Sequence, residues 1–253
     1  IWIQPASGDA GGALGAALAV WHLHYNKARF VSSKRDEMKG AYLGPEYSDS
    51  EIEANLKNCG AVYKKLSQDD LIEEVTEALV CGKAIGWMQG KMEFGPRALG
   101  GRSIIADPRS ADMQKQLNLK IKYRESFRPF APSILIEDIN QWFKHSKDSP
   151  YMLLVADVHD DKRRLMTNKD KALFGIDKLN VPRSTVPAIT HVDYSARIQT
   201  VHADTNPLYH SLISMFKKKT GCPLVVNTSF NVRGEPIVCN PADAFKCFMG
   251  TEL

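Results

Sequence analysis

The stretch NPLYHSLISMFKKKTGCPLVVNTSFNVRGEPIVCNPADAF, residues 206–245, contains two helix signals separated by a strand signal. Asn206 followed by Pro207 is typical of a helix start, and Gly221 is typical of a helix end. Residues 223–227 form an apolar run that leads into a polar loop, and Asn240 then caps a further helix. A helix, a buried strand and a helix in this order indicate an α/β domain.

The chain shows the same alternation from about residue 48 onward. The capping box Ser48–Glu51 predicts a helix to about Asn58, and residues 68–80 predict a second helix with acids in its first turn. Residues 110–121 are also predicted to be helical. Short apolar runs predict strands at residues 61–63, 84–88, 133–136, 151–156 and 198–201. We therefore expect an α/β fold, a mixed twisted sheet with flanking helices.

The N-terminal part of the chain has a different character. Ile1–Ile3 predict a short strand, which a glycine-rich turn connects to an Ala/Leu-rich helix ending at about Tyr25. This helix has no polar face on its first three turns, so it requires burial on nearly all sides. We expect a terminal strand–helix remnant of an upstream domain at residues 1–28, a linker at 29–47, and a second domain at 48–253 with a polar excursion or lid at 157–187.

The composition is that of an ordinary globular protein. The chain has 253 residues, 43% hydrophobic and 25% charged, which is enough for a core without disulfides. Its longest uncharged apolar stretch has 11 residues, whereas a membrane span needs about 20. Five scattered cysteines without a C-x-x-C pair, and a start without signal-peptide features, favour a cytoplasmic protein with reduced thiols and no membrane partner.

The positive charge of the chain is concentrated in one segment. Residues 91–128 hold nine Lys or Arg and four Asp or Glu, a local excess larger than the +4 of the whole chain. Glycine, proline and aromatic residues separate these cations, and few acids lie at helical pairing distance. Because guanidinium groups match the geometry of phosphate and carboxylate, the segment indicates an anion site rather than a solvated charged face.

The first of three notable loops, GKMEFGPRALGGRS at residues 90–103, combines four glycines with the cations Lys91, Arg97 and Arg102. Glycines allow backbone amides to approach an anion while guanidinium groups hold it. The P-loop pattern G-x-x-x-x-G-K-[ST] is absent. A purely structural turn remains the alternative.

The second loop, residues 120–132, places Lys122 and Arg128 on either side of aromatic residues that can bracket a base or a polyphosphate. The same features suit an RNA-binding loop with stacking aromatics, and this alternative stays open.

The third loop, Asn227–Asn231, follows a predicted strand, where α/β sheets often bind ligands. Ser229 has no base beside it in the sequence, so we expect a hydrogen-bond donor rather than a nucleophile. His191 and His202 are the histidines expected nearest to it in space. A serine hydrolase is the alternative, although no G-x-S-x-G elbow is present.

Metal ligation is predicted at one residue only. His22 and His24 would lie on a helix with their rings about 200° apart, so they cannot chelate one ion. Asp9, in a glycine turn before a helix, is the better candidate ligand. A helix N-cap is an equally simple role for this residue.

Several of these stretches together resemble the O-carbamoyltransferase family of nodulation-factor and antibiotic biosynthesis. The longest motifs are GKMEFGPRALGGRSIIADPR at 90–109 and NTSFNVRGEPIV at 227–238. The matching stretches are residues 5–17, 42–45, 86–109, 122–132, 187–201 and 227–241. The resemblance implies an actin-like ATPase-fold domain that transfers a carbamoyl group to a hydroxyl. It further implies a YrdC-like domain that makes carbamoyl-adenylate from ATP and carbamoyl phosphate, corresponding here to residues 48–253.

The resemblance also implies roles for individual residues, with no protein nucleophile required. Cationic side chains would neutralise the phosphates, and Ser229 with its neighbouring asparagines would hydrogen-bond the carbamoyl or phosphate oxygens. The predicted catalytic residues are Arg97, Lys122, Arg128, Arg197 and Ser229. The predicted substrate- or ATP-binding residues are Lys91, Arg102, Arg124, Met152, His191, Asn227, Asn231 and Arg233, and Asp9 matches a metal-site aspartate of the first domain.

The cofactors implied are ATP with Mg²⁺, and a divalent transition metal, iron among the candidates, in the full-length transferase domain. The expected partners are small molecules, namely ATP, carbamoyl phosphate and a hydroxyl acceptor, and a homodimer is left open. An RNA-binding or tRNA-modification-related module is the alternative function. A net charge of only +4, without a basic stripe elsewhere, disfavours nucleic acid.

Overall fold

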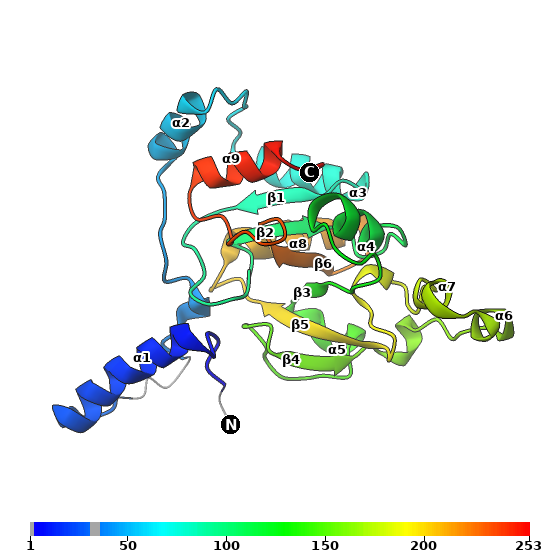
Figure 1. Cartoon of the computed structure of the whole chain (residues 1–253), viewed down its shortest axis with the longest axis horizontal. Helices are drawn as coiled ribbons and strands as arrows, with labels where there is room; N and C mark the ends of the chain where they lie inside the picture. Colours follow the sequence, from blue (N-terminus) through cyan, green and yellow to red (C-terminus); the bar gives the residue numbers. More distant parts are fainter. Residues whose placement is uncertain (1–2, 31–35) are drawn as a thin grey trace.

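A mixed six-stranded sheet forms the centre of the computed structural model, which describes residues 3–30 and 36–253 (Figure 1). The strands of the described chain are β1 (Ile85–Met88), β2 (Arg102–Ala106), β3 (Ala131–Leu135), β4 (Leu154–Asp157), β5 (Ser195–Val201) and β6 (Leu224–Ser229). Their order across the sheet is β1-β2-β6-β3-β5-β4. β3 and β5 run parallel, and the other neighbours pair antiparallel.

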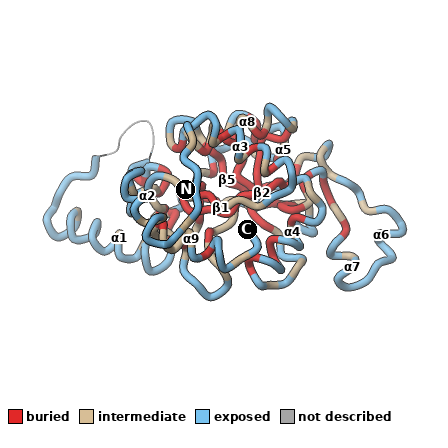
Figure 2. Tube along the Cα trace, turned by 90° about the horizontal axis from the view of Figure 1, so that it is seen from above, coloured by how far each residue is buried: buried red, intermediate tan, exposed pale blue. Residues whose placement is uncertain are grey.

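Helices cover both faces of this sheet. The described α-helices are α1 (Asp9–Ala19), α2 (Asp49–Asn58), α3 (Gln68–Val80), α4 (Met113–Gln116), α5 (Ile139–Trp142), α6 (Asn168–Ala172), α7 (Gly175–Leu179), α8 (Pro207–Thr220) and α9 (Pro241–Met249). Viewed from above, α3 and α8 lie on one face, and α4 and α9 lie on the other (Figure 2). The expected α/β fold with a mixed sheet and flanking helices is thereby confirmed at this level.

The main core lies on both faces of the sheet, and α8 covers one of them (Figure 2). Ile104 and Ile105 of β2 and Ile134 of β3 are fully buried together with Tyr209 and Phe216 of α8. Apolar side chains at helical spacing on α8 therefore meet apolar side chains of the central strands. This rigid centre fixes the ends of β6 and β3, from which the loops of the candidate site extend.

Two helices begin and end where the sequence predicts. Asn206 accepts a hydrogen bond from the Tyr209 amide at the start of α8, and Gly221 ends that helix in a left-handed conformation. Ser67 caps α3 in the same way through the amide of Asp70. Local capping chemistry therefore determines these boundaries.

Two predictions about strands were wrong. Residues 61–63 form no strand, because Val62 is fully exposed and pairs with no neighbouring strand of the described chain. β2 was missed, since it begins with Arg102 and lies in what the sequence presents as a glycine-rich loop. Its first side chain is buried only because distant carbonyl groups surround the guanidinium.

Two further predictions hold only in part. The helix expected at 110–121 is α4 followed by a π-helical segment, Leu117–Ile121. The buried strand expected at 151–156 is β4, which lies at the edge of the sheet and leaves Val155 exposed.

Two segments project from the α/β body. α1 continues as a π-helical segment, Val20–His24, extends away from the sheet, and contains no buried residue (Figure 1). The excursion at 157–187 carries α6 and α7 away from the sheet in another direction (Figure 1). Of the predicted strand at 1–3, Ile1 and Trp2 lie outside the described residues, and Ile3 belongs to no strand. In the described ranges, no helix is both long and apolar enough to cross a membrane.

Candidate anion-binding site

Lys122 joins the second and third loops of the sequence. Its amine donates to the backbone oxygens of Ser229 and Asn231, the latter at 2.9 Å, and to Asn231 Oδ1 at 2.8 Å. Ser229 Oγ, at the end of β6, donates to the same Oδ1 at 2.6 Å. The structure therefore brings together three residues that the sequence predicted, from positions more than 100 residues apart along the chain.

Lys122 and Arg124, two of the cations on the second loop, have lowered pKa values. Burial, assisted by the charge of Arg124, lowers the pKa of Lys122 to about 7. Burial and then the charge of Arg128 lower the pKa of Arg124 to about 10. Arg124 is held by Asn118 Oδ1 at 2.6 Å, and its guanidinium lies 4.8 Å from the ring centre of Phe130. The positive charges are thus close enough to oppose one another.

Three arginines from separate segments lie close together, and none of them has an acidic partner in the part of the chain that the structure describes. Arg97 comes from the glycine-rich loop, Arg128 from the loop before β3, and Arg197 from β5. Among the described residues, Arg109 and Arg163 form ion pairs with carboxylates, and none of these three arginines does. The Nε atoms of Arg97 and Arg197 are buried without a hydrogen-bond partner. Burial, then the charges of Arg97 and Arg128, lower the pKa of Arg197.

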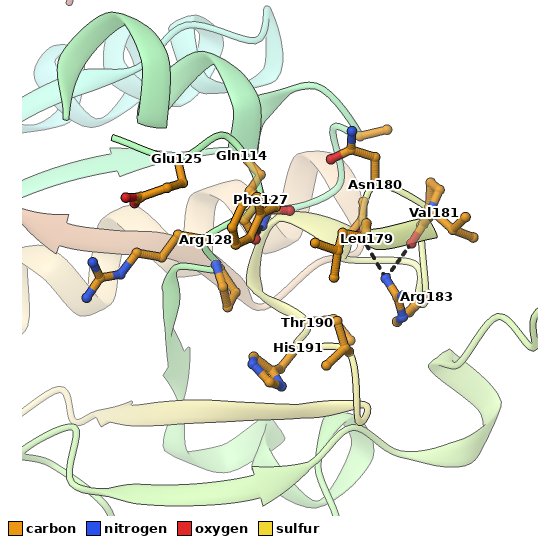
Figure 3. Close-up of a pocket in the computed structure, with 15 residues that line it drawn as sticks. Gln114, Glu125, Phe127, Arg128, Leu179, Asn180, Val181, Arg183, Thr190 and His191 are labelled. Atoms are coloured by element: carbon orange, nitrogen blue, oxygen red, sulfur yellow. Dashed lines mark hydrogen bonds between the residues drawn. The ribbon is translucent and has the colours of Figure 1, made fainter. Parts of the chain in front are cut away.

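A small polar cavity of about 260 Å³ lies between these loops. We call it the cationic cavity, and its lining residues are Lys122, Arg124, Glu125, Arg128, Thr228, Ser229, Asn231, Val232, Arg233 and Gly234. A second cavity of about 430 Å³, the side cavity, shares Glu125 and Arg128 with it (Figure 3). An anion in the cationic cavity would meet cations from both loops and the hydroxyl of Ser229.

The glycine-rich loop at 90–103 is organised around a carboxylate of the protein itself. Glu93 is buried, and its Oε1 accepts hydrogen bonds from the amides of Leu99 at 2.6 Å, Gly101 at 2.7 Å and Arg102 at 3.3 Å. The amide of Gly100 donates a hydrogen bond to Ser103 Oγ at 3.0 Å. These amides were expected to approach a ligand, and the structure instead pairs them inside the loop. The sequence reasoning missed Glu93, although an acid inside a glycine-rich cationic loop was a usable signal.

Arg102 is separate from the other predicted cations. Its side chain is fully buried, and its guanidinium donates to carbonyl oxygens of Gln89 at 2.9 Å and Pro45 at 3.1 Å, among others. Burial is the main reason that its pKa is lowered, and the charge of Glu93 opposes this. Arg102 thus holds several loops together rather than facing a cavity.

Asn227 is also committed to internal contacts. Its Nδ2 lies 2.8 Å from Gln199 Oε1, 2.9 Å from Ser133 Oγ and 3.0 Å from the carbonyl oxygen of Ala98. Its Oδ1 is buried without a partner among the described residues. Asn227 therefore connects β6 to β3, β5 and the first loop.

The remaining predicted residues are dispersed. Met152 is buried in a small core cluster and adopts a positive φ of 54°. His191 is exposed, lies 3.1 Å from Asp193, and lines the side cavity. Arg233 lines the cationic cavity and donates to the carbonyl oxygen of Tyr123 at 3.3 Å. Lys91 is exposed and lines neither cavity. His202 lies away from the cavity and pairs with Asp148 at 2.7 Å.

The side chains suited to a resident metal ion are dispersed as well. Within the ranges that the structure describes, no three His, Cys, Asp or Glu residues are arranged to hold one. Asp9 is exposed at the first position of α1, and a lone carboxylate does not make a metal site. The described residues therefore do not fit the implied transition metal, and we assign no chemical step to it.

The fold and these contacts define a mixed α/β domain with a candidate anion site between loops at the strand ends. The family described as "Carbamoyltransferase C-terminus" matches residues 76–253. The chain belongs to this family, which confirms the resemblance stated above.

Relatives of this chain include an uncharacterized protein, a nodulation protein and an O-carbamoyltransferase. An uncharacterized protein (sll1178) of Synechocystis sp. is 59% identical over 100% of this chain and 41% of its own length. The nodulation protein NolO of Bradyrhizobium diazoefficiens is 38% identical over 100% of this chain and 42% of its own length. A 3'-hydroxymethylcephem-O-carbamoyltransferase of Streptomyces clavuligerus is 29% identical over 96% of this chain and 40% of its own length. The chain thus spans about two fifths of the length of these relatives.

Proposed function

We propose that this chain is the part of an O-carbamoyltransferase that binds ATP and carbamoyl phosphate and forms carbamoyl-adenylate. The observation that carries the proposal is the group Arg97, Arg128 and Arg197, which has no acidic partner among the described residues. Guanidinium groups that repel one another are stabilised when an anion binds between them. Of the three, Arg128 lines the cationic cavity. Two substrates that together carry many phosphate oxygens meet this requirement.

The residues of the site perform electrostatic and positioning roles in this proposal. Water cleaves carbamoyl phosphate to carbamate and inorganic phosphate. ATP enters as its Mg²⁺ complex, and a carbamate oxygen attacks its α-phosphorus. The bond between the α-phosphorus and the oxygen that bridges it to the β-phosphate then breaks, and pyrophosphate leaves. Arg128 and Arg197 neutralise the charge of the phosphates. The Ser229 hydroxyl, which donates its one hydrogen to Asn231 Oδ1 in the structure, turns to donate it to a carbamoyl or phosphate oxygen when substrate binds. Lys122 holds Ser229 and Asn231 in position through its contacts with both.

The names of the relatives suggest which kind of molecule accepts the carbamoyl group in this proposal. Two of them are named as O-carbamoyltransferases of a hydroxymethylcephem. By analogy, the activated carbamoyl group would move to a substrate hydroxyl. Because this chain spans about two fifths of their length, the acceptor site is assigned to the whole protein rather than to this chain.

The test of the proposal is pyrophosphate release by the full-length protein. We expect release from ATP that depends on carbamoyl phosphate, and a decrease of at least about tenfold in Arg128→Gln, since one charge-assisted contact contributes about 1.5–3 kcal/mol. Lys218→Met removes a positive charge from an exposed position on α8 and should leave the rate unchanged. Binding of ATP without any carbamoyl-phosphate-dependent pyrophosphate would refute the half-reaction.

A second candidate function is RNA binding, and it is favoured by one observation. Tyr123 and Phe127 are 50% and 40% exposed beside the cations of the second loop, as stacking residues of an RNA-binding loop would be. RNA affinity that falls steeply with salt and resists competition by ATP would support this candidate over the enzyme.

A further inference from the structure

Three buried polar side chains from neighbouring strands contact one another inside the sheet. Gln199 of β5 accepts hydrogen bonds at Oε1 from Ser133 Oγ of β3 at 2.5 Å and from Asn227 Nδ2 of β6 at 2.8 Å. Its Nε2 donates to the carbonyl oxygen of Leu99, in the glycine-rich loop, at 2.8 Å. Each of the three side chains is at most 2% exposed. We call Ser133, Gln199 and Asn227 the buried polar cluster.

Two candidate site residues are attached to this cluster through the backbone of their own strands. Side chains two residues apart on a strand project from the same face of the sheet. Arg197 is two residues before Gln199 on β5. Ser229 is two residues after Asn227 on β6, and β3 lies between these two strands (Figure 1). Both site residues therefore lie on the face of the sheet that carries the buried polar cluster.

Arg97 is attached to the same cluster from the side of the glycine-rich loop. The two residues that follow it, Ala98 and Leu99, are buried. The carbonyl oxygen of Ala98 accepts from Asn227 Nδ2 at 3.0 Å, and that of Leu99 accepts from Gln199 Nε2 at 2.8 Å. The cluster therefore fixes the backbone from which the side chain of Arg97 extends.

These contacts hold like charges together without an acid between them. Burial, then the charges of Arg97 and Arg128, lower the pKa of Arg197, so the segments that carry these arginines repel one another. A carboxylate placed among them would oppose the repulsion but would also cancel the charge that attracts an anion. Neutral amide and hydroxyl groups that hydrogen-bond to one another and to the backbone oppose the repulsion and leave the positive charge intact.

We propose that Gln199 is a positioning residue, which sets the spacing of Arg97, Arg197 and Ser229 so that all three act on one bound substrate. This inference rests on the proposed function. Gln199 is buried and lines neither the cationic cavity nor the side cavity. It therefore acts through the backbones of the glycine-rich loop, β5 and β6, and not by contact with the substrate.

The variant Gln199→Met in the full-length protein tests this role, with Tyr42→Phe as the matched control. Tyr42 Oη donates to the same carbonyl oxygen of Leu99 at 2.7 Å, but Tyr42 lies outside β5 and β6. In Gln199→Met, Leu99 keeps Tyr42 as its donor, and Asn227 keeps its two other acceptors. Both variants should therefore fold and lose similar amounts of thermal stability.

The rate of the proposed half-reaction should separate the two variants. In Gln199→Met, the kcat of carbamoyl-phosphate-dependent pyrophosphate release should fall by about tenfold or more, because small displacements of positioned groups have effects of this size. In Tyr42→Phe it should change by less than about twofold, since the strands that carry Arg197 and Ser229 stay connected. Equal decreases in kcat at equal loss of stability would show a merely structural role and overturn the inference.

Binding of inorganic tripolyphosphate, measured by calorimetry, gives a second readout that does not depend on the half-reaction. Its dissociation constant should rise at least about threefold in Gln199→Met and stay unchanged in Tyr42→Phe, because one charge-assisted contact contributes tenfold or more. If Gln199→Met does not fold, Ser133→Ala removes one of its hydrogen bonds and should weaken binding in the same direction. Unchanged affinity in every folded variant of the cluster would contradict the positioning role.

The two readouts distinguish failure of this inference from failure of the proposed function. A parent protein that releases no pyrophosphate, but whose tripolyphosphate affinity depends on Gln199 and not on Tyr42, would refute the half-reaction and support the positioning role. Pyrophosphate release that is the same in the parent and in Gln199→Met would support the half-reaction and overturn the inference. A parent that binds no tripolyphosphate would overturn the anion site and the inference with it.

Discussion

Lys122 is surrounded by oxygen atoms that accept hydrogen bonds, although its burial favours the neutral amine. Its acceptors come from Ser229 and Asn231, and the nearest cation is that of Arg124. A residue with a pKa of about 7 changes its charge within the working range of most cells. The charge of the site therefore depends on pH near neutrality.

This dependence gives a prediction for anion binding. The positive charge of Lys122 is present below its pKa of about 7 and is lost as the pH rises through that value. From pH 6 to pH 8 the affinity for tripolyphosphate should fall in the parent relative to Lys122→Arg, whose guanidinium stays charged. Titration of the phosphates is common to both proteins, so the ratio of their dissociation constants isolates Lys122.

A constant ratio of the two dissociation constants across this pH range would show that Lys122 keeps its charge in the folded protein. Cys247, which is close enough to influence Lys122, and Arg124 are unchanged in both proteins. They therefore do not affect the comparison.

Glu93 shows why the sequence reasoning misjudged part of the site. The glycines around it were interpreted as access for a ligand, but a Cβ on Gly101 would lie 2.9 Å from the Lys91 carbonyl oxygen and 3.1 Å from Glu93 Oε1. A Cβ on Gly100 would lie 2.3 Å from the ring of Tyr209. The glycines allow the loop to pack closely around its own carboxylate, and only long-range packing reveals this.

At the scale of elements, the N-cap residues Asn206 of α8 and Ser48 of α2 differ in how much they contribute to the stability of the whole fold. Asn206 caps α8 and also accepts from Gln89 Nε2 at 2.6 Å and donates to Tyr42 Oη at 3.0 Å. Ser48 caps α2 within a complete capping box, but α2 has no buried residue. The first cap is part of the core, and the second stabilises a peripheral helix.

We therefore predict different effects of removing the two caps. Asn206→Ala should lower the free energy of unfolding by about 2 kcal/mol or more, because a cap and two further hydrogen bonds are lost. Ser48→Ala should change it by less than about 0.5 kcal/mol and instead increase amide exchange within α2. Urea denaturation and hydrogen exchange measure the two effects. Equal losses in both variants would contradict the peripheral position of α2.

Elements with local signals were the predictable part of the fold. The bounds of α3 and α8 follow from their caps, and β6 follows from an apolar run with a polar continuation. β2 lacked such a signal, because Arg102 in a strand is stable only where carbonyl oxygens from residues 45, 89 and 239 converge. No local pattern encodes that convergence.

At the scale of the whole molecule, the site depends on charge gathered from distant segments. Lys122, Arg128 and Ser229 were predictable because each lies in a conspicuous loop, and Arg197 followed from the family resemblance. Their arrangement was not predictable, since it follows from the sheet order and from β5 lying beside β3. Arg102 and Asn227 were predicted to bind ligand, but their side chains donate to backbone carbonyl oxygens of the protein itself.

The positive charges gathered at the candidate site should lower the stability of the free protein and favour the binding of anions. Because burial, and then the charges of Arg97 and Arg128, lower the pKa of Arg197, the folded state disfavours this charge. Arg197→Met should therefore raise the free energy of unfolding without anion by about 0.5–1 kcal/mol, a usual gain from relieving an unfavourable charge. At about 100 times the dissociation constant, tripolyphosphate should stabilise the parent by about 2.7 kcal/mol and the variant far less. Thermal unfolding measures both effects. A variant that is less stable than the parent and equally stabilised by tripolyphosphate would contradict the repulsion.

The position of β6 has a consequence for how the protein is made. β6 is the last strand in the chain, yet it lies between β2 and β3 and pairs with both. During synthesis, one edge of β2 and one edge of β3 stay open until residues 224–229 have left the ribosome. At a translation rate of about 5–20 residues per second, this interval after β3 lasts roughly 5–20 seconds. Over that time the nascent chain holds two incomplete sheets with open edges, which are the sites where aggregation or chaperone binding begins.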